Sequence, residues 1–180
     1  MSDPVTKIAT VTPTGTAITQ FNSIPGTYDD LMIIGSSKNA YTGAPSFNIC
    51  SLYLRVNSDT NTNYSWNRWG GAQGGGEVTG SIAQNAILLA ASSTSESSDA
   101  GFGHFYIYIP GYKVASVYKQ MQLVGGFTSS AGAAQMGWTG HAQWSRNDAI
   151  TDIEIRGSNT TADRYYVTGT TMTLYGISNS

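Results

Sequence analysis

The segment "LYLRVNSDTNTNYSW", residues 52–66, decides how this chain is expected to fold. Leu52, Leu54 and Val56 alternate with Tyr53 and Arg55, so apolar and polar side chains fall on opposite sides of an extended backbone. This period of two is typical of a half-buried β-strand, whereas a helix repeats about every 3.6 residues. The segment therefore predicts a strand that ends in a turn.

The turn region has the spacing of a calcium-binding loop, because Asp59, Asn61 and Asn63 stand at alternate positions. The calcium pattern also needs a Gly at its sixth position and a Glu at its twelfth that binds through both oxygens. Those positions hold Tyr64 and Gly70. One carboxylate supplies too little charge to hold calcium, and Asp and Asn favour turns on their own account. The loop is predicted to be the turn of a β-hairpin and not a metal site.

The same alternation recurs along the chain. "HFYIYIP" (residues 104–110) and "TDIEIRG" (residues 151–157) repeat it. Residues 81–93 contain helix-favouring Ala and Leu, but the run is short and evenly apolar, and we interpret it as a strand. Further strands are expected at residues 5–11, 16–22, 30–36, 114–125, 133–144 and 170–177.

Gly, Ser, Asn, Asp and Pro fill the segments between these strands, and "GGAQGGG" (residues 70–76) is expected to be a flexible loop. Many short strands with little or no helix predict an all-β fold, an antiparallel, jelly-roll-like β-sandwich of about nine or ten strands. We expect one domain over residues 21–180, preceded by an N-terminal strand or arm over residues 1–20.

Charged residues make up only 11% of the chain, against about 25% in a typical soluble domain. The net charge is -2 and the basic residues are scattered singly, so no positive stripe is present and nucleic acid is not an expected partner. No run approaches the roughly 18 apolar residues that a membrane span needs, and the N-terminus lacks the pattern of an export signal. We expect a polar, largely uncharged surface and no membrane partner.

Catalytic and metal-binding patterns are absent from the sequence. There is no G-x-S-x-G motif, and the adjacent Asp29 and Asp30 would face opposite sides of a strand. His104 and His141 are the only histidines, and their spacing is not that of a zinc site. The single Cys50 is expected to be a small buried hydrophobic residue. The sequence predicts no enzymatic activity, no metal and no cofactor.

Aromatic side chains are the more suggestive binding groups. On an exposed face they stack on sugar rings or anchor protein interfaces, and the alternative for each is packing in the core. Trp138 and Trp144 are separated by an even number of residues, so they share one face of a strand. The candidate residues for a subunit interface or a glycan contact are Trp66, Trp69, Tyr106, Tyr108, Trp138 and Trp144.

Several segments, taken in order, resemble a family of tailed-bacteriophage virion surface proteins that is common in phages of cyanobacteria and other aquatic bacteria. In that group an IP-x-TY-x-x-L segment precedes an N-x-D-x-x-x-NY hairpin, and a TLYGI strand ends the chain. The resemblance covers roughly residues 21–178. Its motifs here are "FNSIPGTYDDLMIIGSS", "LYLRVNSDTNTNYSW", "FYIYIPGY", "ITDIEIRGS" and "TMTLYGIS".

The resemblance implies a β-sandwich protein on the particle surface, without enzymatic activity and commonly trimeric. The small chain favours a capsid decoration (cement) protein, made in the host cytoplasm, that binds the major capsid protein on the outside of the virion and stabilises the shell. The alternative is a tail-fibre or head-fibre module that contacts host cell-surface glycan through its aromatic residues. Residues 1–20 are then either an arm on the capsid or a neighbouring subunit, or an ordinary edge strand.

Overall fold

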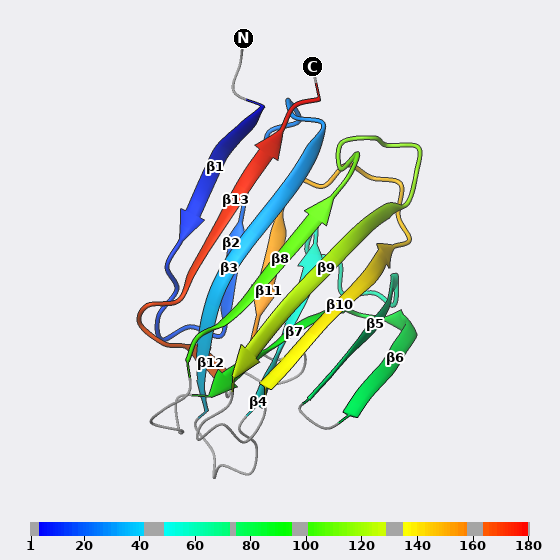
Figure 1. Cartoon of the computed structure of the whole chain (residues 1–180). Helices are drawn as coiled ribbons and strands as arrows, with labels where there is room; N and C mark the ends of the chain where they lie inside the picture. The colour runs from blue at the N-terminus through cyan, green and yellow to red at the C-terminus, as the bar shows by residue number, and fades with distance from the viewer. Residues whose placement is uncertain are drawn as a thin grey trace.

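A computed structural model describes residues 4–41, 49–72, 75–94, 101–128, 135–157 and 164–179. These residues form thirteen strands and no helix (Figure 1). The strands are β1 (Val5–Val11), β2 (Ile18–Phe21), β3 (Asp30–Tyr41), β4 (Ile49–Val56), β5 (Tyr64–Ala72), β6 (Gly75–Gln84), β7 (Ile87–Thr94), β8 (Gly103–Ile109), β9 (Lys119–Thr128), β10 (Gln135–Trp144), β11 (Ile153–Arg156), β12 (Arg164–Tyr166) and β13 (Thr171–Ile177).

The all-β prediction is confirmed, but the chain has more strands than the nine or ten expected. Residues 81–93 are strand except at 85–86, and they are divided between the end of β6 and most of β7. The prediction of a flexible loop over residues 70–76 is wrong for the glycines described there. Gly71 pairs with Gly76, and Ala72 with Gly75, so the backbones of β5 and β6 continue their ladder where side chains give no strand signal. Residues 73–74 lie outside the described part.

The strands form two layers that face each other across the core, with the small sheet behind the large one in Figure 1. The large sheet has the order β1-β13-β3-β8-β9-β10-β5-β6, and the small sheet has the order β2-β11-β4-β7. The two layers are connected through β3 and β7. Only two residues of β3, Lys38 and Asn39, pair with β7, and this pairing is parallel. Every other strand pair is antiparallel, which confirms the antiparallel β-sandwich.

The topology is that of a jelly roll with an insertion. In a jelly roll, strands named B to I in chain order alternate between sheets ordered B-I-D-G and C-H-E-F. The small sheet, β2-β11-β4-β7, follows the first order. In the large sheet β3, β5 and β6 take the places of C, E and F, and the meander β8-β9-β10 takes the place of H. β13 and β1 then extend the sheet beyond β3.

The N-terminal segment joins both layers. β1 is an edge strand of the large sheet, because it pairs with β13 in antiparallel register. β2 follows and pairs with β11 at the edge of the small sheet. For Val5–Val11 the structure thus shows an edge strand that packs its partly buried Ile8, Ala9 and Val11 against the core.

The core lies between the layers and is built by the alternation that the sequence displays. The small sheet contributes Leu52, Leu54, Ile153 and Ile155, all buried, while the intervening residues point away from the core. β8 repeats this pattern in the large sheet with Phe105, Ile107 and Ile109. Burial of these apolar side chains is the main favourable contribution to folding. Cys50 lies in β4, but its side chain is outside the described part.

The prediction of a hairpin after β4 is wrong. β4 pairs with β7 and β11 in the small sheet, whereas β5 pairs with β6 and β10 in the large sheet. Residues 57–63 therefore cross from one layer to the other at the end of the sandwich. A turn signal marks where a strand ends, but the next strand goes to whichever layer buries its apolar face.

The crossing loop is organised by one carboxylate. Asp59 Oδ1 accepts hydrogen bonds from the backbone and side-chain nitrogens of Asn61, each at 2.9 Å. Asp59 Oδ2 accepts from Asn63 Nδ2 at 2.8 Å and from the indole Nε1 of Trp144 at 2.7 Å. The buried Tyr64 hydroxyl is 3.0 Å from the carbonyl oxygen of Asp59. The acidic and amide groups that suggested calcium thus hold the loop against the core.

Candidate interaction surface

Two of the candidate tryptophans are core residues. Trp138 is 7% exposed, and its Nε1 donates to the carbonyl oxygen of Leu89 at 3.0 Å across the sandwich. Trp144 is 2% exposed and donates to Asp59. Their even spacing does place them on one face of β10, but that face points inward. The core-packing alternative therefore describes both, and neither ring can reach a glycan or another subunit while the chain is folded.

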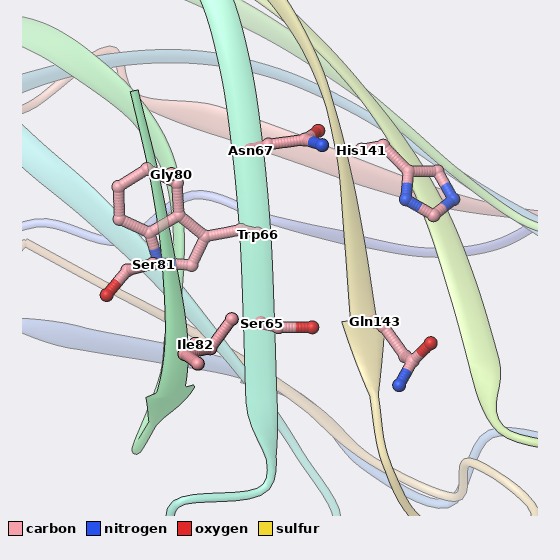
Figure 2. Close-up of a pocket in the computed structure, with 8 residues that line it drawn as sticks. All are labelled: Ser65, Trp66, Asn67, Gly80, Ser81, Ile82, His141 and Gln143. Atoms are coloured by element: carbon pink, nitrogen blue, oxygen red, sulfur yellow. The ribbon is translucent and has the colours of Figure 1, made fainter. Parts of the chain in front are cut away.

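Trp66 and Trp69 lie on opposite faces of β5, because they are three residues apart. Figure 2 shows the Trp66 ring turned toward β6 beside Gly80 and Ser81, while Ser65 and Asn67 point the other way. The Trp66 ring is partly buried and has the Arg68 guanidinium carbon 5.8 Å from its centre. Trp69 is 50% exposed. Of the four tryptophans, Trp69 is the one that offers half its surface to solvent.

Tyr106 and Tyr108 are partly exposed on the outer face of the large sheet, which is the side turned away from the core. The Tyr108 hydroxyl donates to Asp30 Oδ2 at 2.7 Å. This hydrogen bond, together with burial, raises the pKa of Tyr108 to about 12. Burial disfavours the charge of Asp30, but hydrogen bonds from Tyr108, Asn179 and Gly111 lower the pKa of its carboxyl. Tyr108 is therefore a fixed, neutral ring at the border of the face.

The strand register gathers exposed side chains, all of them aliphatic or aromatic except Thr139, into one row across the outer face, which we call the apolar row. Each member stands directly opposite the next on the neighbouring strand, so the row runs perpendicular to the strands. With strands about 4.8 Å apart, its length across six strands is about 24 Å. All its members are at least partly exposed. In order from β3 to β6 they are Ile34, Tyr106, Val124, Thr139, Trp69 and Val78.

A strip without side chains borders the apolar row. In the next register position, Gly126, Gly137, Gly71 and Gly76 stand opposite one another on β9, β10, β5 and β6. A Cβ added at Gly76 would meet no atom within 4 Å, so the sheet is open to solvent at that end of the strip. At the other end the His104 ring lies over Gly126. The side chains of the row therefore project from the sheet as a ridge beside a flat strip of glycine backbone.

A hollow borders the row on its other side. Its volume is about 380 Å³, within the range of about 300–1,000 Å³ common for ligand pockets. Tyr108, Gln122 and His141 stand in register across β8, β9 and β10 along its floor. The hollow is lined by Trp69, Tyr108, Pro110, Gln120, Met121, Gln122, Thr139, Gly140 and His141. None of these is acidic, Lys or Arg.

The histidines are surface residues of this face. His104 on β8 and His141 on β10 are both exposed. In the part of the chain that the structure describes, no group of three or more His, Cys, Asp or Glu residues is placed to hold a metal ion. Asp29 Oδ1 accepts from Lys113 Nζ at 3.1 Å and Asp30 accepts from Tyr108, while Asn179 donates to both carboxylates, from its backbone nitrogen to Asp29 and from Nδ2 to Asp30.

The described residues also include no helix long and apolar enough to cross a membrane.

Sequence reasoning missed most of the apolar row. It singled out Trp69 and Tyr106 because they are aromatic, but not Ile34, Val124 or Val78. Ile34 follows Ile33 in an apolar run, and only the alternation of buried and exposed positions along β3 separates them. Val78 follows the glycine-rich residues 70–76, which were expected to form a loop. No signal within one strand shows that these residues line up, because the register between strands is a long-range property.

No protein-family model, curated protein or solved structure matches this chain.

Proposed function

We propose that this chain is a structural component of a bacteriophage virion, a capsid decoration (cement) protein that binds the outer capsid surface and stabilises it. The observation that supports this best is the apolar row on the outer face of the large sheet. A soluble protein rarely leaves a contiguous apolar patch in water unless the patch binds something. The jelly-roll fold agrees with the proposal, since jelly rolls recur in viral capsid domains, but folds host many functions.

The proposed mechanism is linkage between binding and assembly. The row and the glycine strip form a ridge and a flat floor, which suits a protein surface that lies across several strands. Burial of apolar area contributes about 25 cal/mol per Å² removed from water. A protein that binds the assembled shell but not its separated subunits stabilises the shell by the free energy of that binding. The fixed Tyr108 ring and the half-exposed Trp69 are the proposed anchors.

The partners in this proposal are the major capsid protein and further copies of the chain itself. Made in the host cytoplasm and located on the virion, the protein is proposed to act as a homo-oligomer, and the sequence resemblance implies a trimer. It carries out no catalysis in this proposal.

Electron microscopy of virions labelled with an antibody to this protein tests the location. Label over the head is expected, and label at the tail tip would contradict the decoration role. Binding of recombinant protein to expanded shells that lack it tests the surface. The double variant Trp69→Ala, Val124→Ser is expected to lower affinity for shells at least about tenfold, because aromatic anchors dominate interfaces. Equal shell binding by this variant and the parent chain would exclude the apolar row as the surface that binds the shell.

A second candidate function is a tail-fibre or head-fibre module that binds neutral cell-surface glycan, and the hollow beside the apolar row favours it. Sugars are bound by an aromatic face together with hydrogen-bonding amides, and the hollow combines Trp69 with Gln120, Gln122 and His141. Its uncharged lining suits a neutral sugar. Gln122→Ala separates the two functions, because it is expected to weaken glycan binding on an array while leaving shell binding unchanged.

A further inference from the structure

β6 is the last strand of the large sheet, and no described strand pairs with its outer side. An edge of this kind presents unpaired backbone N–H and C=O groups that can pair with another chain. The most exposed apolar side chains on the described sheet faces are both on β6, since Val78 is 82% and Ile82 is 81% exposed. Exposed edge and exposed apolar residues thus coincide on one strand.

The edge strand β1 carries a lysine and the edge strand β2 is very short, and β6 has neither of these two features that discourage pairing. Edge strands are commonly protected by lysine, by proline or by being very short. β1 carries the exposed Lys7, and β2 has only four residues. Gly75–Gln84 is ten residues long and contains no Lys, Arg or Pro. Its one irregularity is the bulge at Ile82 and Ala83, which lies toward its end.

We propose that two copies of this chain pair through β6, antiparallel and edge to edge, with the two-fold axis beside Gly80. A two-fold contact buries the same surface of both copies and closes with two of them. Pairing satisfies the free backbone groups of both edges at once and joins the two large sheets into one.

The sequence of β6 is complementary to itself in this register. Val78 and Ile82 are equally far from Gly80, so Val78 of each copy stands opposite Ile82 of the other. The two-fold axis therefore produces two equivalent Val78–Ile82 pairs. Directly opposed β-branched side chains stabilise a sheet. Gly80 has no side chain, which lets the strands approach closely at the axis. Glu77, the only charged residue of β6, stands opposite Ala83 in this register, so the two copies of position 77 are not paired with each other.

The surface beside the edge has room for the opposing side chains. A hollow of about 400 Å³ lies where β10, β5 and β6 meet, and Figure 2 shows the side chains around it. Its lining includes Ile82, Gly80 and the partly buried Trp66. A Val78 side chain from the second copy, placed opposite Ile82, would pack at the rim of this hollow.

Pairing also extends the apolar row, which ends at Val78 on the free edge. In the dimer the row of each copy meets Ile82 of the other copy, so the two outer faces form one surface. The inference does not rest on the proposed virion role, because it concerns the isolated chain in solution. A trimer would need a different contact, since edge-to-edge pairing about a two-fold axis involves only two copies.

Sedimentation velocity of the full chain over a range of concentrations tests the pairing. We expect a species of twice the 19.1 kDa of one chain. Val78→Lys together with Ile82→Lys is expected to raise the dissociation constant of the dimer at least about tenfold, because like charges would meet across the axis. Ile18→Lys on the edge strand β2 is the matched control and should leave the dimer intact. Circular dichroism establishes that each variant is folded.

Disulfide cross-linking tests the register. In a Cys50→Ser background, Val78→Cys chains mixed with Ile82→Cys chains are expected to form a covalent dimer on oxidation, whereas neither chain alone should do so. A monomer at all concentrations, a trimer, or a dimer that persists in the double lysine variant would overturn the proposal. Cross-linking of Val78→Cys chains with themselves would overturn the register. None of these results depends on capsid binding, so failure here leaves the decoration role standing.

Discussion

The two outer faces of the sandwich differ in the side chains that they line up across their strands, which are charged or polar on the small sheet and mostly apolar on the large sheet. On the small sheet, Gln20, Glu154 and Arg55 stand opposite one another on β2, β11 and β4. Glu154 Oε1 lies 3.9 Å from Arg55 Nη1 and 3.5 Å from Arg156 Nη1, and Glu154 Oε2 accepts from Gln20 at 3.3 Å. On the large sheet, the same cross-strand geometry lines up Ile34, Tyr106, Val124 and Trp69.

The difference shows which face is available for binding. The charges of the small sheet have partners within their own face, so an incoming protein would have to replace interactions already made. The apolar row has no such interactions to lose, and covering it removes apolar surface from water at about 25 cal/mol per Å². Substitutions on the small sheet should therefore change stability, whereas substitutions on the outer face of the large sheet should change binding.

The largest expected contrast is between two tryptophans of the large sheet. Trp144→Ala should lower the free energy of unfolding by about 3–5 kcal/mol, because it leaves a cavity in the core and removes a donor to Asp59. Trp69→Ala should cost about 1 kcal/mol or less, since half of that side chain is already in water. Urea unfolding measures both. Similar losses in the two variants would mean that Trp69 supports the core and is not a free anchor.

An intermediate effect is expected at the centre of the small sheet's charged face. Glu154→Gln should cost about 2–3 kcal/mol, because Arg55 and Arg156 lose the carboxylate they share at a partly buried site. Arg146→Gln is the matched control. It breaks an exposed pair with Asp148 at 3.2 Å and should cost less than about 0.5 kcal/mol. Shell binding should be unchanged in both, and a loss of binding in Glu154→Gln would assign the small sheet to the interface.

A smaller effect concerns acid. Burial alone would raise the pKa of Asp59, but hydrogen bonds from Asn63, Trp144 and Asn61 outweigh it and lower the pKa to about 2. A carboxyl whose pKa is lower in the folded than in the unfolded state stabilises the fold above its unfolded value of 3.8, and this stability is lost as pH falls toward 2. The loss should be on the order of 2 kcal/mol.

Urea unfolding at a series of pH values between 5 and about 2 measures this loss. Asp59→Asn should be less stable at pH 5 and should show a flatter decline in acid, because it has no carboxyl to protonate at this site. An equally steep decline in the variant would assign the acid sensitivity to other carboxyls.

Much of the fold could be predicted because its signal is local. The alternation in "LYLRV", "HFYIYIP" and "TDIEIRG" predicted β4, β8 and β11, and the structure buries the apolar members of each. β5 and β12 were not among the predicted strand ranges, and only the end of β6 was, because glycine or short length hides the alternation. The layer to which each strand belongs was harder still to predict. Residues 57–63 read as a hairpin turn, yet they connect different layers.

The candidate site shows the same division. Even spacing correctly placed Trp138 and Trp144 on one face of a strand, but this spacing does not show whether that face points toward the core or toward solvent. Those two rings are buried, whereas Trp69 is exposed. Ile34, Val124 and Val78 carry no motif at all. They became candidates only when the register between neighbouring strands, from β3 to β6, placed them in line with Tyr106 and Trp69.

By itself, the sequence determined that this is a β protein with few charged residues and a core of alternating apolar residues, because side-chain alternation and composition can be read from the chain without knowledge of its contacts. Only the tertiary structure decided which strands pair, which face of each strand is covered, and where the free edge lies. Those outcomes depend on contacts between residues far apart in the chain, so the apolar row and the bare edge of β6 exist only once the two sheets have assembled.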